Sequence, residues 1–273
     1  MQVGHICPLD GSNRTFDYCI KECGAKCYQD NLPLLLALIP TNRPVVPDQW
    51  SVTQVTKPPQ ITLLVQRNDY YVLPRRTTFM QWGTAWHNMI EAQRPKLEEL
   101  GVADKYVMEQ RFDVKVPTSL GEIGLRGTPD LYIPHTKTLW DYKTTKAYSI
   151  GKAFKSNEEW MWQLNMYRHY GFPDAEKLVI CGIVRDHSWR VEEKEGIEEI
   201  TIRDVEKYLD KDVEDYVTER LVYLKTCQDN NLYPRPCTDE ERWLNYKGEY
   251  MRCERYCPVS EFCEQYQKEV RDG

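Results

Sequence analysis

Asp130, Asp141 and Lys143 have the residue types and the spacing that metal-assisted hydrolysis requires. They lie in two short segments, residues 127–133 and 139–145, whose composition predicts β-strands. Alternate side chains of a strand share one face, so Asp141 and Lys143 are expected to project together. Two carboxylates and a lysine at one sheet edge can hold a hard divalent cation beside an activated water. Phosphodiester cleavage needs that set of groups.

Four further polar residues follow an order along the chain that strengthens this interpretation. An Asp-x-Lys pair alone recurs by chance and reads equally well as a surface salt bridge. Here His87 lies upstream in a helical pattern, and Glu109 lies on a predicted strand. Gln163 and Tyr167 lie downstream, and their i, i+4 spacing places them on one face of a predicted helix.

In this order the residues resemble the motifs of the PD-(D/E)xK nuclease superfamily. More narrowly, the chain resembles the RecB-like branch, which includes the iron–sulfur exonucleases of CRISPR adaptation and the AddB-type recombination nucleases. The resemblance covers residues 75–185 and the C-terminal cysteines. The motifs are individually loose and jointly specific. The second acid is Asp141, as in the RecB branch, rather than the glutamate common elsewhere.

The resemblance implies a divalent-metal site. Asp130 and Asp141 would ligate Mg²⁺ or Mn²⁺ with the help of the backbone carbonyl of Tyr142, and His87 would be a further ligand. Lys143 would orient or activate the attacking water and stabilise the charge that develops on the phosphate.

The resemblance also assigns roles to three neighbouring residues. Gln163 and Tyr167 would shape the site and contact the nucleic-acid backbone, and Glu109 would be an accessory acid. Each residue also has a structural alternative. His87 suits a buried helix histidine with a hydrogen-bond partner, Glu109 a surface charge, and the glutamine–tyrosine pair simple packing and capping.

The chain has ten cysteines, and eight of them form two clusters, which in a reducing compartment favours metal ligation over disulfides. In the C-terminal cluster, Cys253, Cys257 and Cys263 resemble the [4Fe–4S] site of the RecB-like branch, although the first gap is three residues rather than two. The fourth ligand is either Cys237 or an N-terminal cysteine. We favour Cys237, because the N-terminal cluster then stays complete. Zinc and unligated thiols are the alternatives.

The N-terminal cluster consists of Cys7, Cys19, Cys23 and Cys27. Four thiols within such a short segment suit a tetrahedral zinc site. Two alternatives remain open here: a second iron–sulfur cluster, or three packed core cysteines, because the last three cysteines would share one face of a helix.

The pattern of elements predicts an α/β fold, namely a restriction-endonuclease-like core with a mixed central sheet flanked by helices. We expect three parts: a cysteine-rich N-terminal segment with a proline-rich connector (1–60), the nuclease core (61–233) and a loop-dominated C-terminal iron–sulfur segment (234–273). The expected elements are a helix over 77–100, strands over 105–117, 123–133 and 138–143, a helix over 156–171, a strand over 177–184 and a helix over 202–227.

The composition of the chain argues against two classes of protein, namely membrane-spanning proteins and passive nucleic-acid coats. The chain has 273 residues, 41% of them apolar, and its one notable apolar run, residues 32–39, is too short to cross a membrane. An intracellular, cytoplasmic location is therefore expected. The net charge of −6 argues against a passive nucleic-acid coat, but a nuclease with a carboxylate site is compatible with it.

We therefore expect a Mg²⁺- or Mn²⁺-dependent deoxyribonuclease. Its substrate would be single-stranded DNA or duplex ends, cut as an exonuclease; this preference follows from the resemblance. A helicase, a recombinase or a CRISPR integration protein would be a partner. The alternative is a non-catalytic nucleic-acid-binding subunit of a recombination, repair or CRISPR-type complex. A third interpretation is a scaffold protein that bound zinc stabilises and that has no nucleic-acid role.

Overall fold

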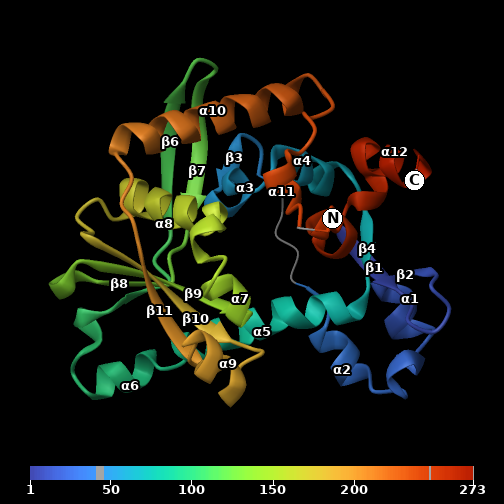
Figure 1. The fold of residues 1–273 in the computed structure, drawn as a ribbon, viewed down its shortest axis with the longest axis horizontal. Helices are drawn as coiled ribbons and strands as arrows, with labels where there is room; N and C mark the ends of the chain where they lie inside the picture. The colour runs from blue at the N-terminus through green and yellow to red at the C-terminus, as the bar shows by residue number, and fades with distance from the viewer. Residues whose placement is uncertain (41–45, 246, 273) are drawn as a thin grey trace. The chain divides into compact units, whose positions relative to one another are not determined.

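The computed structural model describes residues 1–40, 46–245 and 247–272 (Figure 1). The chain divides into two compact units, each described here by itself. Unit 1 comprises Met1–Pro47, Lys57–Gln81 and Leu224–Gly273, and unit 2 comprises Asp48–Thr56 and Trp82–Tyr223. Two helices, α5 (Pro74–Glu91) and α10 (Asp210–Asp229), run from one unit into the other. Across the described residues, no helix combines the length and the apolar composition that a bilayer crossing requires.

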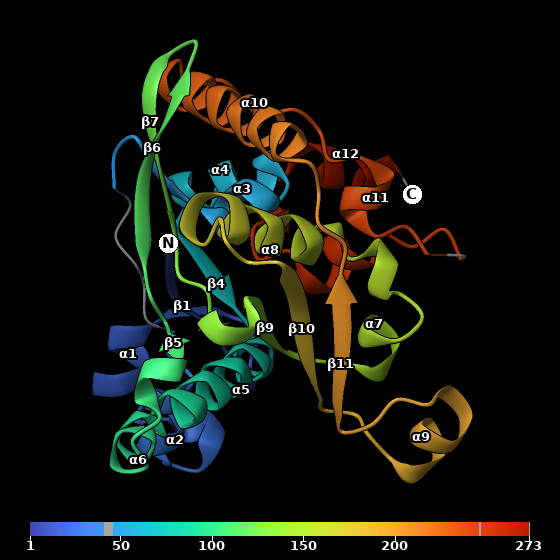
Figure 2. The same cartoon turned by 90° about the vertical axis from the view of Figure 1, so that its left-hand side faces the viewer.

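A five-stranded mixed sheet forms the centre of unit 2. Its strand order is β11-β10-β9-β8-β5, and these strands span Ile200–Val205, Lys177–Val184, Thr138–Thr145, Leu131–Ile133 and Val107–Met108. Strands β9 and β10 pair in parallel and the other neighbours pair antiparallel; Figure 2 shows β10 and β11 side by side. The predicted α/β class and mixed central sheet are confirmed. The uninterrupted apolar run of β10 reflects its position inside the sheet, where Leu178 to Cys181 are buried.

Helices and a smaller sheet pack around this centre. Helix α8 (Glu158–Gly171) contacts β9, β10 and the short helix α3 (Val52–Thr56). Trp162 of α8 stacks on Tyr216 of α10 with ring centroids 3.9 Å apart. Unit 2 also contains α6 (Arg94–Glu99), α7 (Ala147–Ile150), α9 (Trp189–Glu195) and the sheet β3-β7-β6 (Gln49–Ser51, Gly121–Gly127, Phe112–Thr118).

Unit 1 is built on a three-stranded sheet with small helices. Its strand order is β2-β1-β4 (Asn13–Thr15, Gln2–Ile6, Tyr70–Val72), and its helices are α1 (Phe16–Lys21), α2 (Leu32–Ala37), α4 (Pro59–Arg67), α11 (Asp239–Arg242) and α12 (Glu264–Asp272). Cysteines contribute to two of its small cores. Cys19 packs with Ala25 and Leu35, while Cys257 and Cys263 pack with Leu64.

Three predicted elements are each split in two. The strand expected over 123–133 is β7 followed by β8, and residues 128–130, with Asp130, lie between these strands. The break contains Pro129, which has no amide hydrogen for strand pairing. The helix expected over 77–100 is α5 followed by α6. The break precedes Pro95, which has no amide hydrogen and therefore belongs in the first turn of the new helix. The strand expected over 105–117 is β5 followed by β6. The break is at Glu109, whose φ of 49° is incompatible with a continuous strand.

Three other predicted segments differ from the structure in their secondary structure. The helix expected over 202–227 begins only at Asp210, because residues 200–205 form the edge strand β11 with buried Thr201 and Val205. The tail expected to be loop-dominated contains α11 and α12. The proline-rich connector contains β3, α3 and the start of α4; residues 41–45, with Pro44, lie outside the described residues.

Candidate functional site

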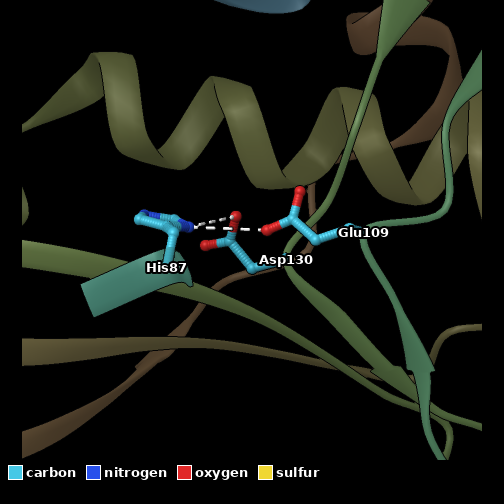
Figure 3. A group of neighbouring side chains, drawn as sticks. All are labelled: His87, Glu109 and Asp130. Carbon is cyan, nitrogen blue, oxygen red and sulfur yellow. Dashed lines mark ion pairs between the residues drawn. The ribbon is translucent and has the colours of Figure 1, made fainter. Parts of the chain in front are cut away.

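His87, Glu109 and Asp130 converge in unit 2 (Figure 3). His87 Nδ1 lies 3.3 Å from Asp130 Oδ1 and 3.5 Å from Glu109 Oε1. One donor atom from each residue falls within 4.8 Å of the other two, and this is the only such group of three found among the described residues. One imidazole and two carboxylates are a donor set that divalent cations use.

Backbone contacts hold the two acids in place. Asp130 immediately precedes β8, and its Oδ2 accepts a hydrogen bond of 2.6 Å from the amide of Tyr142 on β9. The amide of Glu109 donates to the carbonyl of Asp130 at 3.1 Å. Glu109 adopts a φ of 49°, an unfavourable conformation for a side chain of this size, and such outliers cluster at functional sites. This backbone turn points the Glu109 side chain towards His87, whereas a regular strand would place it elsewhere.

A glycine explains how His87 reaches this group. His87 lies in α5, one turn after Gly83. A Cβ at Gly83 would lie 3.3 Å from Thr144 Oγ1 of β9, which is tighter than most contacts of this kind. The absence of a side chain at Gly83 therefore lets the helix approach β9 closely.

A second polar chain begins at Asp141. Lys143 Nζ lies 2.6 Å from Asp141 Oδ2, an ion-pair contact rather than a well-aligned hydrogen bond, and donates to Gln163 Oε1 at 2.9 Å. Gln163 Nε2 in turn donates to the Tyr167 hydroxyl at 2.9 Å. A Cβ at Gly127 would lie 2.8 Å from the Tyr167 ring, so this glycine provides the space for the tyrosine. The lysine ammonium is thus fixed between two elements, β9 and α8.

The electrostatics of the site favour a cation. The neighbouring carboxylates, Asp130 first and Glu109 second, raise the pKa of His87 to about 10. Burial raises the pKa of Asp141, the negative charge of Asp130 raises it further, and Lys143 opposes both. A site whose carboxylates retain a proton on an imidazole this firmly has a strongly negative potential, which also attracts metal ions.

The structure brings together all seven side chains singled out in the sequence, in two groups. His87, Glu109 and Asp130 form one, and Asp141, Lys143, Gln163 and Tyr167 form the other. The compact donor group contains Glu109, which the sequence assigned only an accessory role, and lacks Asp141 and the Tyr142 carbonyl of the expected ligand set.

The C-terminal cysteines line one cavity in unit 1. Cys237, Cys253, Cys257 and Cys263 surround a space of about 10 Å³. Burial raises the pKa of Cys237 to about 12 and that of Cys257 to about 11, so these thiols stay protonated unless a cation replaces their protons. The buried Arg242 and Arg252 line the same cavity, and no motif in the sequence marks them.

The N-terminal cysteines line a separate cavity in unit 1, also contacted by His5. The alternative in which Cys19, Cys23 and Cys27 share one helix face is wrong. Helix α1 ends at Lys21, and a turn with Gly24 and Ala25 at positive φ follows, because these residues interrupt the helical path.

No protein-family model and no curated protein matches the chain. Among solved structures, the crystal structure of SSO0001 is similar over 88% of this chain and 96% of that chain, with 14% identity and a TM-score of 0.51. A phage-related exonuclease from Haemophilus somnus 129PT matches over 55% and 71%, with 17% identity and a TM-score of 0.35. LHK-Exo in complex with dAMP matches over 67% and 91%, with 15% identity and a TM-score of 0.40. The first similarity is one of fold, and the other two TM-scores are too low to support an argument.

Proposed function

We propose that this chain is a divalent-metal-dependent nuclease that hydrolyses phosphodiester bonds in DNA. One observation carries the proposal: an imidazole and two carboxylates converge in the same unit that holds a buried aspartate and an anchored lysine. The order of these residues along the chain resembles the RecB-like branch of the PD-(D/E)xK nucleases, which supports the same conclusion.

The division of labour follows from the chemistry of the donors. Asp130, Glu109 and His87 would hold the metal, with Asp141 as a further ligand. When bound, Mg²⁺ or Mn²⁺ would lower the pKa of a water and offset the charge of the phosphate. Lys143, held by its partners on β9 and α8, would orient the attacking water and stabilise the added negative charge.

The decisive experiment is cleavage of end-labelled DNA by the full chain, with Mn²⁺, with Mg²⁺ and with excess chelator. Asp130→Asn and Asp141→Asn should each reduce the rate by about 10²–10³-fold, because each removes charge that stabilises the reacting groups. Asp104→Asn is the matched control, because Asp104 is exposed and lies in a short 3-10 turn. Cleavage that persists in chelator, or in Asp141→Asn, would rule the proposal out.

For the substrate, we propose digestion from single-stranded DNA or duplex ends, as the resemblance implies. Linear single strands should be degraded, and circular single strands of the same sequence should stay intact. Cutting of the circles at an equal rate would indicate an endonuclease instead. Retention of DNA without cleavage, unchanged in Asp130→Ala, would indicate the non-catalytic binding subunit. A helicase, a recombinase or a CRISPR integration protein is the kind of partner this activity would serve.

We further propose a [4Fe–4S] cluster on Cys237, Cys253, Cys257 and Cys263. Four thiols around one cavity suit such a cluster. Zinc would draw four sulfurs to about 3.8 Å from one another; among the described residues, no three of these sulfurs lie within 4.8 Å. The four thiol donors and the spacing of their sulfurs support this cluster, whereas the small volume of the cavity does not. All ten cysteines are free, which supports an intracellular location.

Cys237→Ser tests the choice of the fourth ligand. It should lower the iron and acid-labile sulfide of anaerobically purified protein as much as Cys253→Ser does. Cys181→Ala is the control, because Cys181 lies on β10, outside the cavity. Iron content unchanged in Cys237→Ser would remove this residue from the site.

A further inference from the structure

The N-terminal cysteines surround the larger of the two thiol-lined cavities in unit 1. Cys7, Cys19, Cys23 and Cys27 all line this space, which has a volume of about 120 Å³. Only Cys19 is buried, and the other three are half-buried. Cys19 packs against Ala25 and Leu35 as well, while the other three cysteines border the open space without being part of that core.

Two tight turns bring the four cysteines together. Cys7 follows β1 in the hairpin to β2, where its amide donates to the Ser12 carbonyl at 2.7 Å. Cys19 lies in α1, and Cys23 and Cys27 lie in the turn and the 3-10 helix that follow. The left-handed conformation of Ala25, with φ of 63°, reverses the chain between the last two cysteines. Packing of three cysteines on one helix is therefore excluded as the reason for their spacing.

His5 gives a second, independent indication of a ligand. It is 2% exposed and lines the same cavity. Its Nδ1 lies 3.3 Å from the Val72 carbonyl, and a carbonyl only accepts hydrogen bonds, so Nδ1 carries the hydrogen. In the neutral ring, Nε2 is then a lone-pair donor to a metal. This buried nitrogen has no hydrogen-bond partner among the described atoms, a costly arrangement unless something else satisfies it.

The spacing of the sulfurs favours a cluster over a single ion. Tetrahedral zinc holds its sulfurs at 2.3 Å from the metal, which places them about 3.8 Å apart. No three of these four sulfurs lie within 4.8 Å of one another, as judged on the described residues. In an iron–sulfur cluster the thiolates bind different irons and lie farther apart.

We propose that Cys7, Cys19, Cys23 and Cys27 ligate a second iron–sulfur cluster, distinct from the one proposed on the C-terminal cysteines. On binding, each thiol gives up its proton to solvent and becomes a thiolate ligand. Arg14, Lys26 and Asp10 also line the cavity. Arg14 is paired with Asp10 at 3.2 Å, so Lys26 is the charge that offsets part of the negative charge of the thiolates. This proposal adopts the alternative of a second iron–sulfur cluster in place of the zinc site expected at these residues.

The test is iron and acid-labile sulfide analysis of the full chain, purified without oxygen. Cys23→Ser/Cys27→Ser and Cys253→Ser/Cys257→Ser should each keep part of the iron, and the quadruple variant should keep none. The two partial contents should add up to that of the unchanged protein. Cys181→Ala, away from both cavities, is the control. Cys23 and Cys27 are chosen because they are half-buried, so serine disturbs the core least.

Two results would overturn the proposal. One is unchanged iron in Cys23→Ser/Cys27→Ser. The other is zinc that disappears with those substitutions while iron stays. Mössbauer spectra of the ⁵⁷Fe-labelled Cys253→Ser/Cys257→Ser variant give an answer that does not depend on the folding of the N-terminal variant, since its N-terminal cysteines are intact. Iron–sulfur signals there support the second cluster, and their absence refutes it. Cleavage of DNA is measured separately and does not bear on this outcome.

Discussion

His87 Nδ1 lies 3.3 Å from Asp130 Oδ1, while the other oxygen of the same carboxylate accepts the Tyr142 amide at 2.6 Å. Asp130 thereby links helix α5 to strand β9 through one side chain. Because the carboxylate is held at one oxygen by the backbone, its position is fixed before any ligand binds. The contact between the Asp130 carboxylate and His87 also raises the pKa of the imidazole.

Metal binding should release the proton that these carboxylates hold on His87. Asp130 and Glu109 raise the pKa of His87 to about 10, and a cation at this group must displace that proton. We therefore expect the affinity for Mn²⁺ to rise as the pH increases from about 6 to about 9. Calorimetry in buffers with different ionisation enthalpies measures the proton release directly. His87→Gln should bind Mn²⁺ more weakly and with less proton release; equal release in this variant would contradict the assignment.

The stability of the metal-free protein should depend on Asp141. Its pKa is raised to about 6 by burial and by the charge of Asp130, although Lys143 opposes the shift. A folded-state pKa above the unfolded value of about 4 means that stability present at low pH is lost as the pH rises towards 6. In excess chelator, the melting temperature should fall over this range, and Asp141→Asn should flatten the fall. An unchanged profile in the variant would show that Asp141 is not the group that titrates.

The contact between Gln163 and Lys143 should matter for turnover more than for substrate binding. Gln163→Leu keeps the volume but removes the hydrogen bonds to Lys143 and Tyr167. A misplaced lysine should lower kcat by up to about 10²-fold with little change in KM. Tyr167→Phe should have a smaller effect, because the lysine keeps its glutamine partner. Steady-state kinetics with Mn²⁺ measure both values.

Glu158→Gln is the control for this pair, since Glu158 is an exposed residue of the same helix α8. If Gln163→Leu raises KM and leaves kcat unchanged, the glutamine contacts the nucleic acid and does not position the lysine.

Local rules could predict much of the candidate site. The period of two in a strand predicted that Asp141 and Lys143 face the same way, and they form an ion pair. The i, i+4 rule predicted that Gln163 and Tyr167 share a helical face, and they are hydrogen-bonded. Both rules concern residues close in sequence, where the geometry of the element alone decides.

Features that depend on long-range contacts or on one unusual backbone angle could not be predicted. Glu109 reaches His87 only because its φ is 49°, and no pattern in the sequence marks that angle. Strand β11 resembled the start of a helix because an edge strand needs few apolar residues, and only its pairing with β10 defines it. His5 came to line the cavity of the N-terminal cysteines only when folding brought β1 beside the cysteine turn.

An ion pair away from the site should contribute to the stability of unit 2. Arg168 is buried and donates to Asp210 Oδ1 at 2.5 Å, and this contact lowers the pKa of Asp210. A lowered carboxyl pKa contributes stability above the unfolded value of about 3.9, and this stability is lost as the pH falls through the folded value.

Asp210→Asn should therefore cost about 1 kcal/mol at neutral pH, because it leaves a buried guanidinium less well paired while water screens an aspartate that is 64% exposed. The deficit should shrink below pH 4, where the carboxylate of the unchanged protein becomes protonated as well. Denaturant unfolding at several pH values measures it. Asp215→Asn on the same helix removes only an exposed pair with Lys211 and should cost less. Equal losses in the two variants would mean that the burial of Arg168 adds nothing to the pair.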